Sequence, residues 1–235
     1  MKWNVTKLIA CASLALVAIM AAARHAPAQE AKTAYPAMAP LDQYLMERGA
    51  EITLALSAAP DSISRDAEVM VLGPHGYETA AKGKNGFACM VMRSWIAGTD
   101  EPEFWNPKVR APICFNAAAV RTYLPQVIRK TNLILAGKSK AQMAEEIGAA
   151  LDKKELPSQE TGAMSYMMSK QGYLNDIGKH WHPHVMFFAP LAAPATWGAN
   201  LVGSPVLASE DALGRLTIFM IPVAKWSDGT PDSHE

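Results

Sequence analysis

The chain has 235 residues, with 22 basic and 22 acidic side chains, 50% hydrophobic residues and three cysteines. This composition is too hydrophobic for a disordered chain and too poor in cysteine for a small disulfide-stapled scaffold. Because the formal net charge is zero, we expect no nucleic-acid partner bound through a basic surface.

Residues 1–28 have the organisation of a secretory signal peptide. Two lysines precede an apolar run over 8–23, and an Ala-Pro-Ala tripeptide at 26–28 supplies the small residues of a cleavage site. The apolar run is shorter than the roughly 20 residues that span a membrane, and no later run is long enough. We therefore expect a periplasmic or secreted protein with no membrane association after cleavage. A retained anchor or a lipoprotein acylated at Cys11 is the alternative.

Cleavage after residue 28 leaves 19 basic and 22 acidic side chains and two cysteines, Cys89 and Cys114. Two cysteines in an exported chain predict one disulfide, because the compartment is oxidising. A reactive thiol is the less favoured alternative.

The remaining chain predicts a flexible lead-in over 29–40, one domain over 41–228 and a C-terminal tail over 229–235. Apolar spacing predicts a helix over 42–58 that ends before Pro60. Short apolar runs separated by turn residues then predict an antiparallel meander over 68–95, with a hairpin turn at Asn85-Gly86.

Residues 96–115 contain three prolines and are expected to be irregular. Asn116 is a candidate cap for a helix over 117–135, which Pro125 should kink or break. Ser139 and Gln142 have capping-box spacing for a second helix that ends near Lys153. The best later strands are 163–168, 185–189 and 216–223. Together the elements predict an α+β fold in which helices pack on an antiparallel sheet.

Three histidines, His180, His182 and His184, form the candidate site. Pro183 favours an extended conformation for the residue before it, and alternate side chains of an extended chain project to one side. Imidazoles presented in this way can bind zinc or copper. The first and last Cα atoms are roughly 13 Å apart in an extended chain, so all three rings reach one ion only if the backbone bends. Two of them with a distant ligand is the easier arrangement.

His75 and Glu78, in and after a predicted turn, are candidates for that distant ligand. A zinc ion would lower the pKa of a bound water, and Glu78 would act as the base of a metal-dependent hydrolase. Copper is the less favoured metal, because methionines such as Met167 and Met186 are more simply explained as core residues.

Two other interpretations of the histidines stay open: structural residues, or a metal-free acid–base site. The alternative function is a non-catalytic periplasmic domain for a small ligand or partner. Its expected binding surface consists of Tyr166, Tyr173, Trp181 and Phe187. No motif in the sequence decides between an enzyme and a binding domain.

Four segments together resemble a family of exported bacterial proteins. The likeness would cover about residues 45–228, and it implies export and a single domain. It implies no activity, cofactor or catalytic residue. The segments are GPHGYETAAKGKNGFACMVMRSW (73–95), FWNPKVRAPICFN (104–116), GAMSYMMSKQGYL (162–174) and HWHPHVMFF (180–188).

Overall fold

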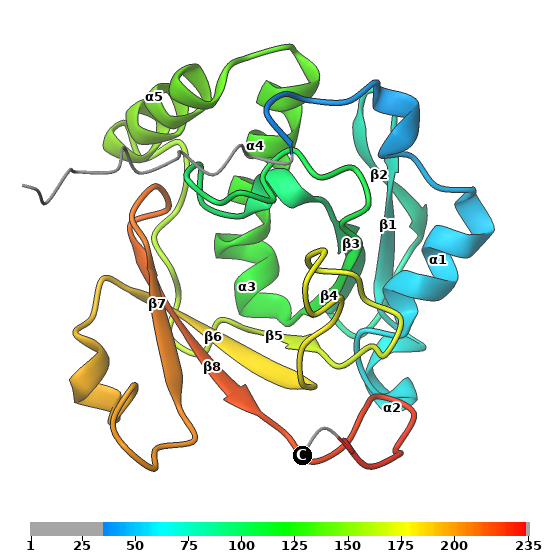
Figure 1. Cartoon of the computed structure of the whole chain (residues 1–235), viewed down its shortest axis with the longest axis vertical. Helices are drawn as coiled ribbons and strands as arrows, with labels where there is room; N and C mark the ends of the chain where they lie inside the picture. Colours follow the sequence, from blue (N-terminus) through cyan, green and yellow to red (C-terminus); the bar gives the residue numbers. More distant parts are fainter. Residues whose placement is uncertain (1–34, 234–235) are drawn as a thin grey trace, which may run out of the picture. The chain divides into compact units, whose positions relative to one another are not determined.

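An eight-stranded sheet runs through residues 35–233, the part of the chain that the computed structural model describes (Figure 1). Its strand order is β2-β1-β3-β4-β5-β6-β8-β7. The predicted signal peptide and the start of the lead-in lie outside the described residues, as do the last two residues of the tail. The strands are β1 (Glu68–Gly73), β2 (Gly76–Ala81), β3 (Ala88–Met92), β4 (Ala111–Phe115), β5 (Met164–Met167), β6 (His184–Pro190), β7 (Leu207–Asp211) and β8 (Leu216–Pro222).

All neighbouring strands are antiparallel except β1 and β3, which are parallel. The α+β prediction is confirmed, but the predicted meander over 68–95 is wrong at its last step, since β3 pairs with β1 and not with β2. The link from β2 to β3 passes against the start of β1. A Cβ atom at Gly83 would lie 2.1 Å from the backbone nitrogen of Glu68, so only glycine fits there.

Helices occur in two groups along the chain. The predicted helix over 42–58 is divided into two pieces, because the Glu47 carboxylate accepts hydrogen bonds from the backbone of Gly49 and Ala50 and starts a new helix there. The first group is η2 (Leu41–Gln43), α1 (Arg48–Leu56), α2 (Asp61–Ser64) and η3 (Ser94–Ile96). The second group is α3 (Ala117–Thr122), α4 (Leu124–Leu135), α5 (Lys140–Asp152) and η4 (Pro194–Trp197).

The caps predicted for the second group are confirmed. The side chain of Asn116 accepts a hydrogen bond from the backbone of Ala119 at the start of α3. Ser139 and Gln142 form the reciprocal capping box of α5. The break between α3 and α4 falls at Tyr123, two residues before the proline expected to cause it.

The two faces of the central strands are covered by different helices (Figure 1). α1 packs on one face of β1, β3 and β4, while α3 contacts β4 and β5, and α4 contacts β2 and η3. Met90 and Ile113 belong to the larger hydrophobic cluster, with α4 and α5, whereas Val91 and Cys114 belong to the cluster under α1.

Two strands were not predicted. Every residue of β4 is buried, so its sequence has no polar–apolar alternation, and its Pro112 favours a loop interpretation. β7 is an edge strand without a buried side, so it lacks a hydrophobic pattern as well. Among residues 35–233, no helix combines the length and the hydrophobicity needed to cross a membrane.

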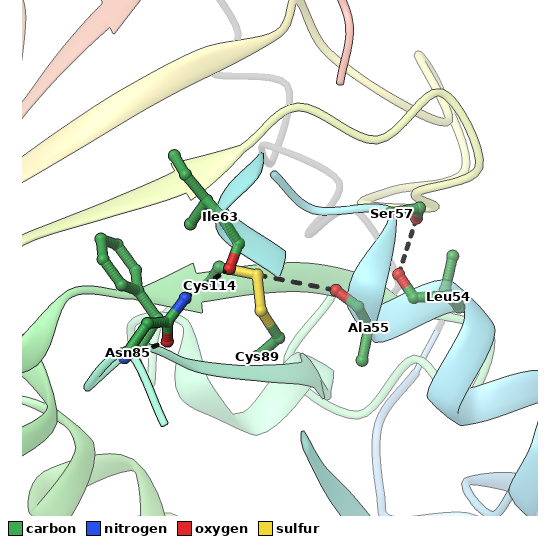
Figure 2. The surroundings of a disulfide bond; sticks show 8 residues. Leu54, Ala55, Ser57, Ile63, Asn85, Cys89 and Cys114 are labelled. Atoms are coloured by element: carbon green, nitrogen blue, oxygen red, sulfur yellow. Dashed lines mark hydrogen bonds between the residues drawn. A yellow bond between two sulfur atoms is a disulfide. The ribbon is translucent and has the colours of Figure 1, made fainter. Parts of the chain in front are cut away.

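The predicted disulfide joins Cys89 and Cys114, which face each other across β3 and β4 (Figure 2). Both side chains are fully buried. Figure 2 shows the Cys114 sulfur facing the carbonyl oxygen of Ala55 in α1, at 3.8 Å. The bond therefore ties the two most buried strands together beneath this helix.

Candidate functional site

The three predicted metal ligands lie at the start of β6 and in the connection before it. His184 is the first residue of β6 and pairs with Met167 of β5 and Pro222 of β8. His180 and His182 precede the strand in an irregular segment. The strand therefore begins only at the last of the three histidines.

Each imidazole contacts a different partner. Nδ1 of His182 lies 2.5 Å from a carboxylate oxygen of Asp232. Nδ1 of His184 lies 2.7 Å from the backbone oxygen of His182. The ring of His180 packs edge-on against Trp226, with ring centroids 5.4 Å apart.

His180 and His184 nevertheless line one small cavity, together with Met167, Ser169 and Trp181. Its volume of about 10 Å³ is about the least that holds one water molecule. His182 is not among the lining residues. Burial lowers the pKa of His184 below its ordinary value, so this imidazole stays neutral near pH 7 and keeps a nitrogen lone pair.

The two proposed distant residues lie elsewhere in the sheet. His75 is in the turn between β1 and β2, and Glu78 is in β2, with Oε1 2.5 Å from Nη1 of Arg48. Four strands separate β2 from β6. At about 4.8 Å per strand, the separation along the sheet is on the order of 24 Å. The structure does not bring His75 or Glu78 to the histidine cluster.

Within residues 35–233 there is no group of three or more His, Cys, Asp or Glu side chains that could hold a metal ion. The site of three histidines, and the zinc or copper expected in it, stays a prediction. The geometry brings only His180 and His184 to a common cavity.

Asp232 is a partner of the cluster that the sequence did not indicate, because it falls in the predicted tail. Its backbone nitrogen donates to the carbonyl oxygen of Ala224, and Lys225 and Pro231 form an isolated bridge. The tail is therefore bonded to the domain at least as far as Asp232.

The four aromatic residues expected to form a binding surface have separate contacts. Tyr166 packs near Phe87, and Phe187 packs near Trp197. The Tyr173 hydroxyl donates to a carboxylate oxygen of Asp176. Trp181 packs edge-on against His184.

A cavity of about 560 Å³ lies between the segment after η3 and the turn from β7 to β8. We call it the acidic cavity. Its volume is within the usual range for small-molecule sites. Its apolar lining includes Ile96, Leu174, Leu213 and Ile218. The charged residues of the lining are all acidic, with no lysine or arginine among them. They are Asp100, Glu101, Glu103, Glu210 and Asp211.

Tyr123 lines the same cavity and is only 5% exposed. Its ring stacks on Phe188, with centroids 4.0 Å apart, and its hydroxyl has no hydrogen-bond partner among the described residues. Burial, helped by the Asp211 carboxylate, raises the pKa of Tyr123, so the hydroxyl is neutral. The hydroxyl oxygen keeps some exposed surface although the residue as a whole is buried, so it is available to a ligand in the cavity.

The Asp211 carboxylate pairs with a buried lysine, Lys130. Nζ of Lys130, on α4, lies 3.4 Å from the Asp211 carboxylate and 3.5 Å from the carbonyl oxygen of Ile96. Both contacts are long for charge-assisted hydrogen bonds. Lys130 therefore partly neutralises one carboxylate and leaves the cavity negative.

Sequence reasoning missed the acidic cavity because its acidic residues come from two segments over 100 positions apart, and one segment includes the unpredicted strand β7.

Comparisons with protein-family models, with curated proteins and with solved structures find no match. A function must therefore be assigned from the chemistry of the described residues.

Proposed function

We infer that this protein is an exported, non-catalytic domain that binds a small organic cation with an apolar body in the acidic cavity. The observation that carries the proposal is the lining of the acidic cavity, which combines five carboxylates and apolar side chains with the hydroxyl of Tyr123, a group that forms no hydrogen bond with the described residues. A tyrosine hydroxyl that reaches the cavity can donate a hydrogen bond to a bound ligand or accept one from it.

The charge of the lining selects the sign of the ligand. Asp100, Glu101 and Glu210 form no ion pair with the described residues. Carboxylates gathered around one opening raise the local concentration of cations. The apolar lining would contact the uncharged part of the same molecule. An organic amine with a hydrophobic group satisfies both features.

The export part of the proposal depends on the signal-like residues 1–28 and on the disulfide, since disulfides persist in oxidising compartments. Secretion into the medium or the periplasm of an expressing bacterium, with loss of these residues, is the expected behaviour.

Calorimetric titration with tryptamine tests the ligand class. Tryptamine should bind at least 10-fold more tightly than indole-3-propionate, which carries the same ring and the opposite charge. Glu210→Gln should weaken tryptamine binding 2- to 5-fold, about the effect of one exposed charge pair. Tyr123→Phe should weaken it further while leaving the thermal midpoint unchanged, because the hydroxyl forms no hydrogen bond with the described residues.

Glu145→Gln is the matched control, because Glu145 is an exposed carboxylate of α5 outside the cavity. It should bind tryptamine as the unchanged protein does. Equal binding of both indole compounds, or full tryptamine affinity in Tyr123→Phe and Glu210→Gln, would refute the proposed ligand class.

A second candidate function is metal binding at His180 and His184, favoured because both line one cavity with the Met167 thioether. Two imidazoles and a thioether suit Cu(I) better than Zn(II). After treatment with a chelator, the protein should take up one Cu(I) per chain, more tightly than Zn(II), and His180→Gln should lose this ion. His75→Gln should retain it. Equal metal content in the His180→Gln variant and the unchanged protein would rule this site out.

A further inference from the structure

A second cavity, of about 270 Å³, is lined by residues of opposite character to the acidic cavity. We call it the basic cavity. It lies among the C-terminal end of α5, the segment that follows it and the turn from β7 to β8. Its polar lining includes Lys154, Arg215, Gln126, Gln159 and the backbone of Gly214, and it contains no carboxylate.

Both cations have a backbone conformation that L-residues rarely adopt. Lys154 has φ 58° and Arg215 has φ 53°. Lys154 follows the C-cap of α5, where its backbone nitrogen donates to the Leu151 carbonyl. Glycine or asparagine is the usual residue at such a position. Lys154 and Arg215 thus place long cationic side chains at positions where glycine, which lacks a Cβ atom, would be less strained.

The two glutamines supply hydrogen-bond acceptors. The amide nitrogen of Gln126 donates to the Gly214 carbonyl at 3.3 Å, and that of Gln159 donates to the Thr122 carbonyl at 3.1 Å. These bonds fix the orientation of each amide. The buried side-chain oxygens of both residues have no partner among the residues described. Gln126 itself is only 1% exposed.

The charge of the cavity is only partly neutralised. Arg215 pairs with Asp152 through Nη1, at 2.7 Å, so its remaining N–H groups stay available. Lys154 has no ion pair within the described part of the chain. Two cations beside two unsatisfied acceptors match a ligand that has a carboxylate and, next to it, a hydroxyl that donates a hydrogen bond.

We propose that the basic cavity binds a small hydroxycarboxylate, with Lys154 and Arg215 on the carboxylate and the oxygens of Gln126 and Gln159 accepting from the hydroxyl. The volume suits a molecule the size of malate. The site has no lining residue in common with the acidic cavity and takes a ligand of opposite charge, so either proposal can fail without the other.

Titration of the purified protein with L-malate and with succinate, which lacks the hydroxyl, tests the proposal. Malate should bind at least 10-fold more tightly than succinate. Gln159→Met should abolish most of this difference by weakening malate binding, while succinate binding stays unchanged. Lys154→Gly should weaken malate binding at least 10-fold and leave the thermal midpoint unchanged or higher, because glycine relieves the strained backbone.

Lys179→Gly is the matched control, because Lys179 is a lysine with φ 60° that does not line the cavity. This variant should keep full malate affinity. The proposal is overturned if malate and succinate bind equally, if neither binds at millimolar concentration, or if Lys154→Gly binds malate as the unchanged protein does.

Discussion

Glu51→Gln should lower the free energy of unfolding by roughly 3–5 kcal/mol, because it leaves the buried guanidinium of Arg93 without its counter-charge. Nη2 of Arg93 lies 2.9 Å from Oε1 of Glu51, and the two side chains are at most 1% exposed. The same carboxylate oxygen accepts a hydrogen bond from the backbone of Leu72. Urea unfolding of the variant and of the unchanged protein measures the effect.

Arg93 also donates to the carbonyl oxygens of Tyr44 and Val91, at 2.7 and 2.5 Å. The pair therefore joins α1, the residue that follows η2, and the sheet at one buried point. The double variant Glu51→Leu, Arg93→Met should recover much of the stability that Glu51→Gln loses, because an uncharged apolar pair carries no desolvation penalty.

Glu78→Gln is the control for this prediction. Its partner Arg48 is on α1, as Glu51 is, but both members of that pair are more than half exposed. Exposed pairs contribute about 0–1 kcal/mol. If Glu51→Gln cost no more than Glu78→Gln, the buried pair would not be a major source of stability.

Replacing both Cys89 and Cys114 with alanine should destabilise the protein by about 3.5 kcal/mol in the chain-entropy description of a cross-link. The two cysteines are separated by 25 positions, and the uncross-linked unfolded chain gains the freedom of that loop. Alanine is preferred to serine because the two positions are fully buried among apolar residues. A lower urea midpoint with a steeper dependence on urea is the expected result.

The unchanged protein supplies the control for the disulfide. When it is unfolded and refolded in a strong reductant, its urea midpoint should approach that of the double variant. An unchanged midpoint in the double variant would mean that the cross-link contributes nothing measurable to stability.

Local signals predicted the helix ends most successfully. Asn116 and Ser139 act through hydrogen bonds to residues three positions away, so their role can be read from a short stretch of sequence. The strand pairing after Asn85-Gly86 was wrong for the opposite reason. The chain does bend at residues 84–86, but there is no hairpin there, because which strand receives β3 depends on the path of the chain past Glu68.

The histidine cluster shows the limit of spacing arguments for sites. Spacing predicted three imidazoles on one side of an extended segment, but the segment becomes a strand only at His184. His182 contacts Asp232, and His180 contacts Trp226, and both partners come from the end of the chain. Contacts at such sequence separation follow from packing and have no local pattern.

The sequence by itself determined the α+β class, the caps of α3 and α5, and the pairing of the two cysteines left after the signal-like segment. Each depends on composition, on residues a few positions apart, or on there being one possible partner. Only the tertiary structure decided the parallel pairing of β1 with β3, the buried pair of Glu51 and Arg93, and the two cavities of opposite charge. These features join side chains from distant segments, and hydrophobic packing of the helices against the sheet determines which of them meet.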